Sequence, residues 1–133
     1  MKRFLFFTFI LLTACGGRQQ DYRKAENGLD AGREFISACL QGDFRKAAFF
    51  MLPGEKNTEK LKEIEKAYRV KDKEGRQNLR TASINIREVS DIDPLTTHIS
   101  YNNSFDTLPQ MIRVVKQNDS WLVDLNHTNN PVP

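Results

Sequence analysis

Three side chains in the C-terminal half of the chain could act as acids or bases, namely His98, Tyr101 and Asp124. A hydrolase or isomerase would need one of them in a cavity, where burial shifts its pKa, beside a second polar group. Strand alternation separates them instead, because His98 and Tyr101 should lie on opposite faces of one strand. Asp124 should point away from its apolar neighbours in the last strand. The sequence therefore predicts no catalytic pair.

Metal and phosphate chemistry is equally poorly supported. His98 and His127 have no Cys, His, Asp or Glu partner at metal-binding spacing. Neither a Gly-rich phosphate loop nor a Cys-x-x-Cys pair occurs, so we expect no metal and no cofactor. Residues 56–80 hold nine basic and five acidic residues, which fits either attraction to an anionic lipid surface or a solvated helix of mixed charge. We expect no nucleic acid as a partner, because the interleaved acids weaken any phosphate track.

The remaining chemistry belongs to two thiols, Cys15 and Cys39. Cys15 directly follows Ala14 at the end of a leader in which residues 4–12 are apolar except for one threonine. As a helix, this apolar stretch would span roughly 14 Å, about half of the hydrocarbon thickness of a bilayer. Its length is therefore typical of a secretory signal and not of a membrane span. Cys39 falls on the apolar side of a predicted helix, where a buried, inert thiol is expected.

The run Leu12-Thr13-Ala14-Cys15, followed by two glycines, resembles the lipobox of bacterial lipoproteins. The resemblance implies cleavage between Ala14 and Cys15, a diacylglycerol thioether on Cys15 and an N-acyl chain such as palmitate on the new terminus. Two or three acyl chains hold a protein on a membrane without a spanning helix. Gly16 is not an acidic retention residue, so the outer membrane is the preferred location within the cell envelope. An ordinary signal peptide with a cysteine at its cleavage site is the alternative.

Length and composition fit one small domain. The chain has 133 residues, of which 39% are hydrophobic and 28% charged, as in ordinary globular proteins. Its net charge of +3 comes largely from the leader, since removal of Lys2 and Arg3 lowers the 20 basic residues to 18 against 17 acidic ones. We expect four segments: a signal peptide over residues 1–14, the lipidated cysteine and a flexible tether over 15–27, one domain over 28–126, and a loose tail over 127–133.

The domain is predicted to contain helices first and strands afterwards. Apolar residues at helical spacing predict a helix over residues 28–41 between Asn27 and Gly42, a short second helix after Asp43, and a third over 58–73. Period-2 alternation then predicts strands near residues 83–87, 95–105, 111–116 and 121–125. Their connections, the first of which is expected to be a turn at residues 91–94 with Asp91 and Asp93, are short and favour an antiparallel meander. The sequence therefore indicates an α+β domain in which N-terminal helices pack on one face of a sheet of about four strands.

Two motifs resemble one known superfamily. The first helix ends in Gly42-Asp43-Phe44. Residues 114–124 have the pattern of a hairpin, in which hydrophobic residues and a lysine are followed by a polar turn and then by a tryptophan, hydrophobic residues and an aspartate. These are similar to the nuclear transport factor 2-like (cystatin-like) superfamily, and more narrowly to small envelope lipoproteins of unknown function with such a domain. The resemblance spans about residues 25–126 and implies a curved sheet around a long helix, with a conical cavity between them. Because this fold hosts enzymes, ligand binders and scaffolds, it selects no function.

The lipid anchor and a conical cavity with no identifiable catalytic residues together predict a non-enzymatic binding module. Its ligand would be a small apolar molecule or an envelope protein, in addition to the membrane held by the anchor. The pocket candidates, which could equally be core, are Phe35, Cys39, Tyr101 and Trp121. A partner protein would need an apolar outer sheet face, expected at Met111, Val115 and Leu122. The alternatives are an isomerase, dehydratase or hydrolase with Tyr101 or His98 as acid or base, and a tethered structural spacer.

Overall fold

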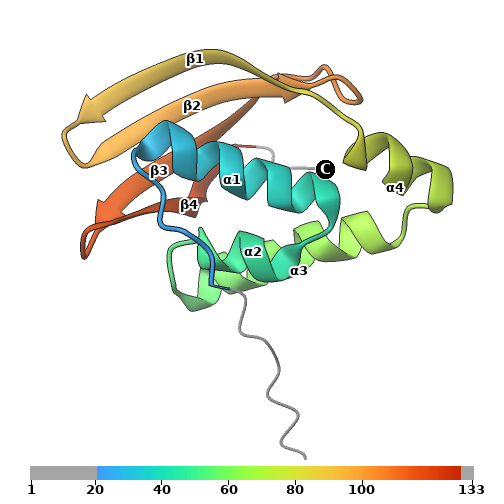
Figure 1. Ribbon diagram of the computed structural model, residues 1–133, viewed down its shortest axis with the longest axis horizontal. Coiled ribbons are helices and arrows are strands. Elements are labelled where there is room, and N and C mark those ends of the chain that lie inside the picture. Colours follow the sequence, from blue (N-terminus) through green and yellow to red (C-terminus); the bar gives the residue numbers. More distant parts are fainter. Residues whose placement is uncertain (1–20, 130–133) are drawn as a thin grey trace, which may run out of the picture.

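The helix α1 (Gly28–Gln41) lies along the inner face of the sheet and positions the other elements (Figure 1). The computed structural model describes residues 21–129. Asn27 caps α1, since its side-chain oxygen accepts a hydrogen bond from the N–H of Asp30 at 2.8 Å. Gly42 ends the helix with φ of 75°, a left-handed conformation that favours glycine. Both predicted ends of this helix are confirmed.

Three more helices follow: α2 (Phe44–Phe49), α3 (Glu55–Arg69) and α4 (Lys73–Arg80). The third helix predicted over residues 58–73 is confirmed as α3, but it ends four residues earlier, at Arg69, and α4 was not predicted. The buried side of α3 ends at Tyr68, and one turn later that side would have to bury Lys71 or Asp72. The chain turns there instead, and the Asp72 side chain accepts a hydrogen bond from the Gly75 N–H at 2.7 Å to start α4.

The sheet is the predicted antiparallel meander, with strand order β1-β2-β3-β4. Residues Asn118 and Asp119 have φ of 49° and 59°, which makes the link between the last two strands a tight two-residue hairpin turn. Figure 1 shows β1 and β2 bending over α1. The strands are β1 (Ile84–Asp93), β2 (Thr96–Asn103), β3 (Gln110–Gln117) and β4 (Ser120–Asn129).

The first strand is longer than predicted, since β1 includes the acidic segment that was expected to be a connection. Its register against β2 shifts twice, between Ile86 and Glu88 and between Asp91 and Asp93, so bulges carry the strand forward. The hydroxyl of Thr97 donates to Asp91 at 2.7 Å across the pair. Two residues then suffice to connect β1 to β2.

The ends of the domain extend beyond their expected limits. The ring of Tyr22 lies 5.4 Å from that of Phe49, and Ala25 packs against the core. At the other end, β4 runs on to Asn129, past the regular apolar alternation that ends at Leu125. The described part of the expected tether and the first part of the expected tail therefore belong to the folded structure.

The outer edge of β4 is closed by the segment between α2 and α3. The N–H of Val123 donates to the carbonyl of Phe50 at 2.7 Å, and the N–H of Leu52 donates to the carbonyl of Val123 at 2.8 Å. The buried side chain of Asn57 continues this edge, because its oxygen accepts from the Leu125 N–H at 2.9 Å and its nitrogen donates to the Leu52 carbonyl at 3.0 Å. The other end strand of the sheet is β1.

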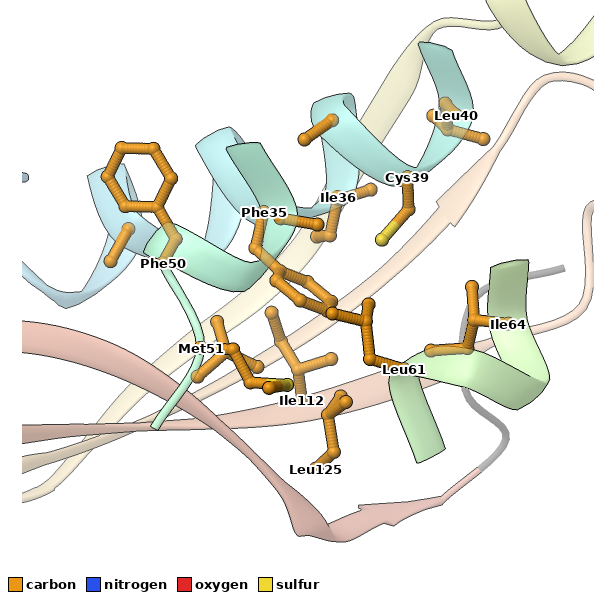
Figure 2. Close-up of a cluster of buried hydrophobic side chains, with 14 of the residues drawn as sticks. Phe35, Ile36, Cys39, Leu40, Phe50, Met51, Leu61, Ile64, Ile112 and Leu125 are labelled. Atoms are coloured by element: carbon orange, nitrogen blue, oxygen red, sulfur yellow. The ribbon is translucent and has the colours of Figure 1, made fainter. Parts of the chain in front are cut away.

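Close contact between α1 and the sheet fills the interior. A Cβ added to Gly32 would lie 2.4 Å from Cδ1 of Ile99, and one added to Gly28 would lie 2.6 Å from Oγ1 of Thr97. The two glycines therefore let the helix backbone approach β2 directly. Figure 2 shows the resulting apolar cluster, formed by α1, α3, the sheet and the segment after α2.

Candidate functional site

Three of the four predicted pocket residues lie in the closed core. Phe35, Cys39 and Tyr101 are at most 2% exposed, and Figure 2 shows Phe35 and Cys39 pointing from α1 into the cluster that includes Leu61 and Ile64. Burial raises the pKa of the Cys39 thiol. Burial also raises the pKa of Tyr101, with smaller contributions from Cys39 and Asp106. These groups pack and do not titrate near neutral pH.

The fourth residue, Trp121, lines an open cleft of about 690 Å³ at one end of the sheet. In Figure 1 both hairpins extend past the first turn of α1, and residues of this turn and of the hairpins line the cleft. Its volume falls within the roughly 300–1,000 Å³ typical of small-molecule sites. The residues around it are Asn27, Gly28, Leu29, Val89, Asp91, Asp93, Pro94, Thr97 and Trp121.

One wall of this cleft is acidic. Asp91 accepts a hydrogen bond from the Thr97 hydroxyl through one oxygen, and Asp93 accepts from the Leu95 N–H at 2.8 Å through one oxygen. Within residues 21–129, the second oxygen of each carboxylate has no hydrogen-bond partner. Two carboxylates held in place by local bonds can therefore accept hydrogen bonds from a ligand.

The lining also has an apolar part. It consists of Leu29 from the first turn of α1, Val89 from β1, where 40% of the residue is exposed, and the half-buried Trp121. The Nζ of Lys116 lies 5.9 Å from the centroid of the indole ring and helps to hold it. None of the residues that line the cleft is a histidine, cysteine, serine or lysine. The arrangement can bind a molecule through apolar contacts and through the two carboxylates.

The other acid–base candidates lie on the outer face of the sheet or in the core. His98 borders a hollow of about 150 Å³ on the outer face, whereas Tyr101 donates its hydroxyl to Gln110 at 2.8 Å inside the core. The prediction that alternation separates the two is confirmed. Tyr101 is closed off in the core, whereas His98 shares its hollow with Glu88 and Ser90.

Asp124 points away from the core, as predicted, but it is not a solvated strand residue. It is 5% exposed and pairs with Arg113 at 3.2 Å and His127 at 3.0 Å. Burial alone would raise the pKa of Asp124, but the Asn126 N–H, His127 and Arg113 together outweigh burial and lower it. Arg113 stands directly opposite Asp124 in the register of β3 and β4. The sequence reasoning missed this cross-strand pair, because it depends on register.

The outer face of the sheet mixes apolar and polar side chains. The three residues expected to form a partner-binding patch are half-buried and share this face with His98, Arg113 and Asp124. The three are Met111, Val115 and Leu122. The face is neither fully polar nor a continuous apolar patch.

Several further properties bear on function. The helices within residues 21–129 are too short or too polar to cross a bilayer, and this same stretch contains no group of three or more His, Cys, Asp or Glu side chains suited to a metal ion. Ala14 and Cys15 lie outside the described residues. Comparison with protein families and with curated proteins finds no match.

Proposed function

We propose that the chain is a bacterial envelope lipoprotein whose folded domain is a non-enzymatic binding module for a small ligand. The leader supports the anchor, because the apolar stretch is too short to span a membrane and a cysteine stands at the lipobox position. Tyr22 already packs on the domain, and seven residues of extended chain reach at most about 25 Å. The domain would therefore stay close to the membrane that holds Cys15, preferably the outer membrane.

The observation that carries the binding function is the cleft at Trp121. We assign it to the mouth of the cystatin-like cone, since it opens where the curved sheet extends past the start of α1. The deeper part of the cone is filled, because Gly28 and Gly32 bring α1 onto β2. The ligand therefore binds at the end of the sheet and does not enter the interior.

The walls define the chemistry of this ligand. Leu29, Val89 and Trp121 cover an apolar face, while Asp91 and Asp93 can only accept hydrogen bonds as carboxylates. A matching molecule carries an apolar face together with hydroxyl or ammonium donors. This class differs from the small apolar ligand expected from the sequence, because it also carries hydrogen-bond donors.

Trp121 also supplies the assay, because it is the single tryptophan of the chain. We would titrate the full chain in non-ionic detergent with 2-phenylethylamine and, as the matched anion, with phenylacetate. The ammonium compound should change the tryptophan fluorescence saturably at about millimolar concentration, corresponding to roughly 4 kcal/mol. Phenylacetate should bind far more weakly, because the same carboxylates repel it.

A charge variant separates the cleft from general electrostatics. Asp91→Asn keeps an oxygen for Thr97 but removes one charge, and should weaken 2-phenylethylamine binding by about tenfold. Glu63→Gln removes one charge from an exposed position on α3 and should leave binding unchanged. Equal binding of the two probes, or equal effects of the two variants, would overturn the assignment of this cleft.

A further inference from the structure

A second pocket, of about 320 Å³, lies where the end of α1 meets α3 and α4. Figure 1 places α4 at the end of the molecule opposite the two hairpins, so this pocket is separate from the Trp121 cleft and does not depend on the function proposed for it. Three of its residues are arginines. The lining consists of Gly42, Phe44, Tyr68, Arg69, Arg76 and Arg80.

Tyr68 forms the fixed wall of this pocket. Its ring lies against Gly42 so closely that a Cβ there would be 2.6 Å from the ring. The ring of Phe44 packs edge-on against the Tyr68 ring, with the two ring centroids 5.7 Å apart. The Nε of Arg80 donates to the Tyr68 hydroxyl at 2.9 Å. Tyr68 therefore holds the guanidinium of Arg80 through its Nε and leaves the two terminal nitrogens available.

Arg76 is held equally firmly by the turn between α3 and α4. Its Nη1 donates to the carbonyl oxygens of Arg69, at 3.4 Å, and Lys71. The Nε and Nη2 of Arg76 make no hydrogen bond within the described part of the chain. Two neighbouring guanidinium groups thus border one pocket in orientations fixed by the protein itself.

These two charges lack a carboxylate counter-ion. Arg69 is neutralised by Glu65, whose carboxylate accepts a hydrogen bond from the Arg69 Nε at 2.9 Å. Among residues 21–129, neither Arg76 nor Arg80 forms an ion pair, and no acidic residue lines the pocket. Like charges held together without a partner repel, and the forked donors of arginine match the oxygens of phosphate. Part of the basic excess over residues 56–80 is therefore concentrated at this pocket, in Arg76 and Arg80.

We propose that the pocket of Tyr68, Arg76 and Arg80 binds a phosphate group, supplied either by a soluble phosphate compound or by a phospholipid headgroup. Arg80 contributes its two terminal nitrogens and Arg76 its Nε and Nη2. Arg69 stays paired with Glu65 at the rim.

The test follows the arginine Nε–H signals of the full chain in non-ionic detergent by NMR while inorganic phosphate is added. The signals of Arg76 and Arg80 should shift saturably. Arg80→Gln should weaken binding by about tenfold. Lys73→Gln removes the same charge from an exposed position outside the pocket and should change the affinity by less than about twofold.

A second variant keeps the test decisive if Arg80→Gln does not fold. Tyr68→Phe leaves the net charge unchanged and removes only the hydroxyl that positions Arg80, so phosphate binding should weaken by about threefold. Equal weakening by Arg80→Gln and Lys73→Gln would show non-specific attraction and overturn the proposal. So would the absence of a saturable shift both with inorganic phosphate, up to about 10 mM, and with short-chain phosphatidic acid.

The source of the phosphate group is distinguished by the micelle composition. Short-chain phosphatidic acid is added to the detergent in place of inorganic phosphate, with short-chain phosphatidylcholine as the control. Shifts at lower concentration with phosphatidic acid than with free phosphate identify a headgroup site. Shifts with free phosphate alone identify a soluble ligand, and shifts with neither contradict the proposal.

Discussion

Replacement of Asn57 by alanine tests how the edge of the sheet is closed. Asn57 is 1% exposed, and its amide group joins α3 to β4 and to the segment after α2. Alanine would fit the helix well, so a loss of stability cannot be assigned to helix propensity. The variant removes both hydrogen bonds and leaves the polar groups of Leu125 and Leu52 without these partners.

The expected loss follows from the burial of those two groups. The N–H of Leu125 is buried in this contact, and an unpaired buried donor costs about 1–3 kcal/mol. The Leu52 carbonyl is partly buried, so the loss of its partner adds about 0.5–1.5 kcal/mol. We expect Asn57→Ala to lower the free energy of unfolding by about 2–4 kcal/mol, a large share of the roughly 5–15 kcal/mol of a typical domain.

Urea denaturation followed by circular dichroism measures this loss. Asn78→Ala is the matched control, because Asn78 is exposed on α4 and its replacement should change stability by less than about 0.5 kcal/mol. The slope of the free energy against urea concentration should stay the same for both variants. A loss below about 1 kcal/mol for Asn57→Ala would refute the reasoning, since it would mean that these bonds do not close the β4 edge.

Three further outcomes are expected. Gly32→Val should destabilise the domain by at least about 1–3 kcal/mol in urea denaturation, because even its Cβ would lie 2.4 Å from Ile99 Cδ1; an unchanged midpoint would contradict the close packing of α1. Cys39, which is 2% exposed and has a raised pKa, should react with a thiol reagent only in denaturant, so rapid labelling of the native protein would count against it. Folding lowers the pKa of Asp124 from 3.8, so the stability that its carboxylate contributes is complete above that pH and is lost as the pH falls through the lower, folded pKa. Asp124→Asn should therefore reduce the loss of stability at acidic pH. An unchanged acid dependence in this variant would argue against the pairing of Asp124.

The sequence predicted the elements whose ends are determined locally. Asn27 and Gly42 mark the ends of α1 because capping depends on a few neighbouring residues. The meander follows from short connections, among them the turn at Asn118 and Asp119. The start of α4 was missed, although Asp72 is a capping residue, because the charged positions after Tyr68 fit an exposed helix equally well.

Pocket and core residues could not be separated in the same way. Tyr101 and Trp121 both read as inward-facing, and their environments differ because α1 covers one and stops short of the other. The distance between helix and sheet decides this, and Gly28 and Gly32 on the buried side of α1 were the available signal.

Contacts between residues far apart in the chain could not be predicted from the sequence either. Asn57 meets Leu125, and Tyr68 meets Arg80, only because the helices and strands are brought together in this order. Asp91 and Asp93 were expected to form a turn, and the bulged extension of β1 places them beside the cleft instead. Strand register and bulges depend on pairing across the whole sheet, which local patterns do not specify.

The proposed anchor is tested most directly by the intact mass of the protein extracted with detergent from its native bacterial host. We predict a chain that begins at Cys15 and carries a diacylglycerol thioether together with an N-acyl group. A mass that corresponds to an unmodified Cys15, or to a chain that still includes residues 1–14, would contradict the lipoprotein assignment.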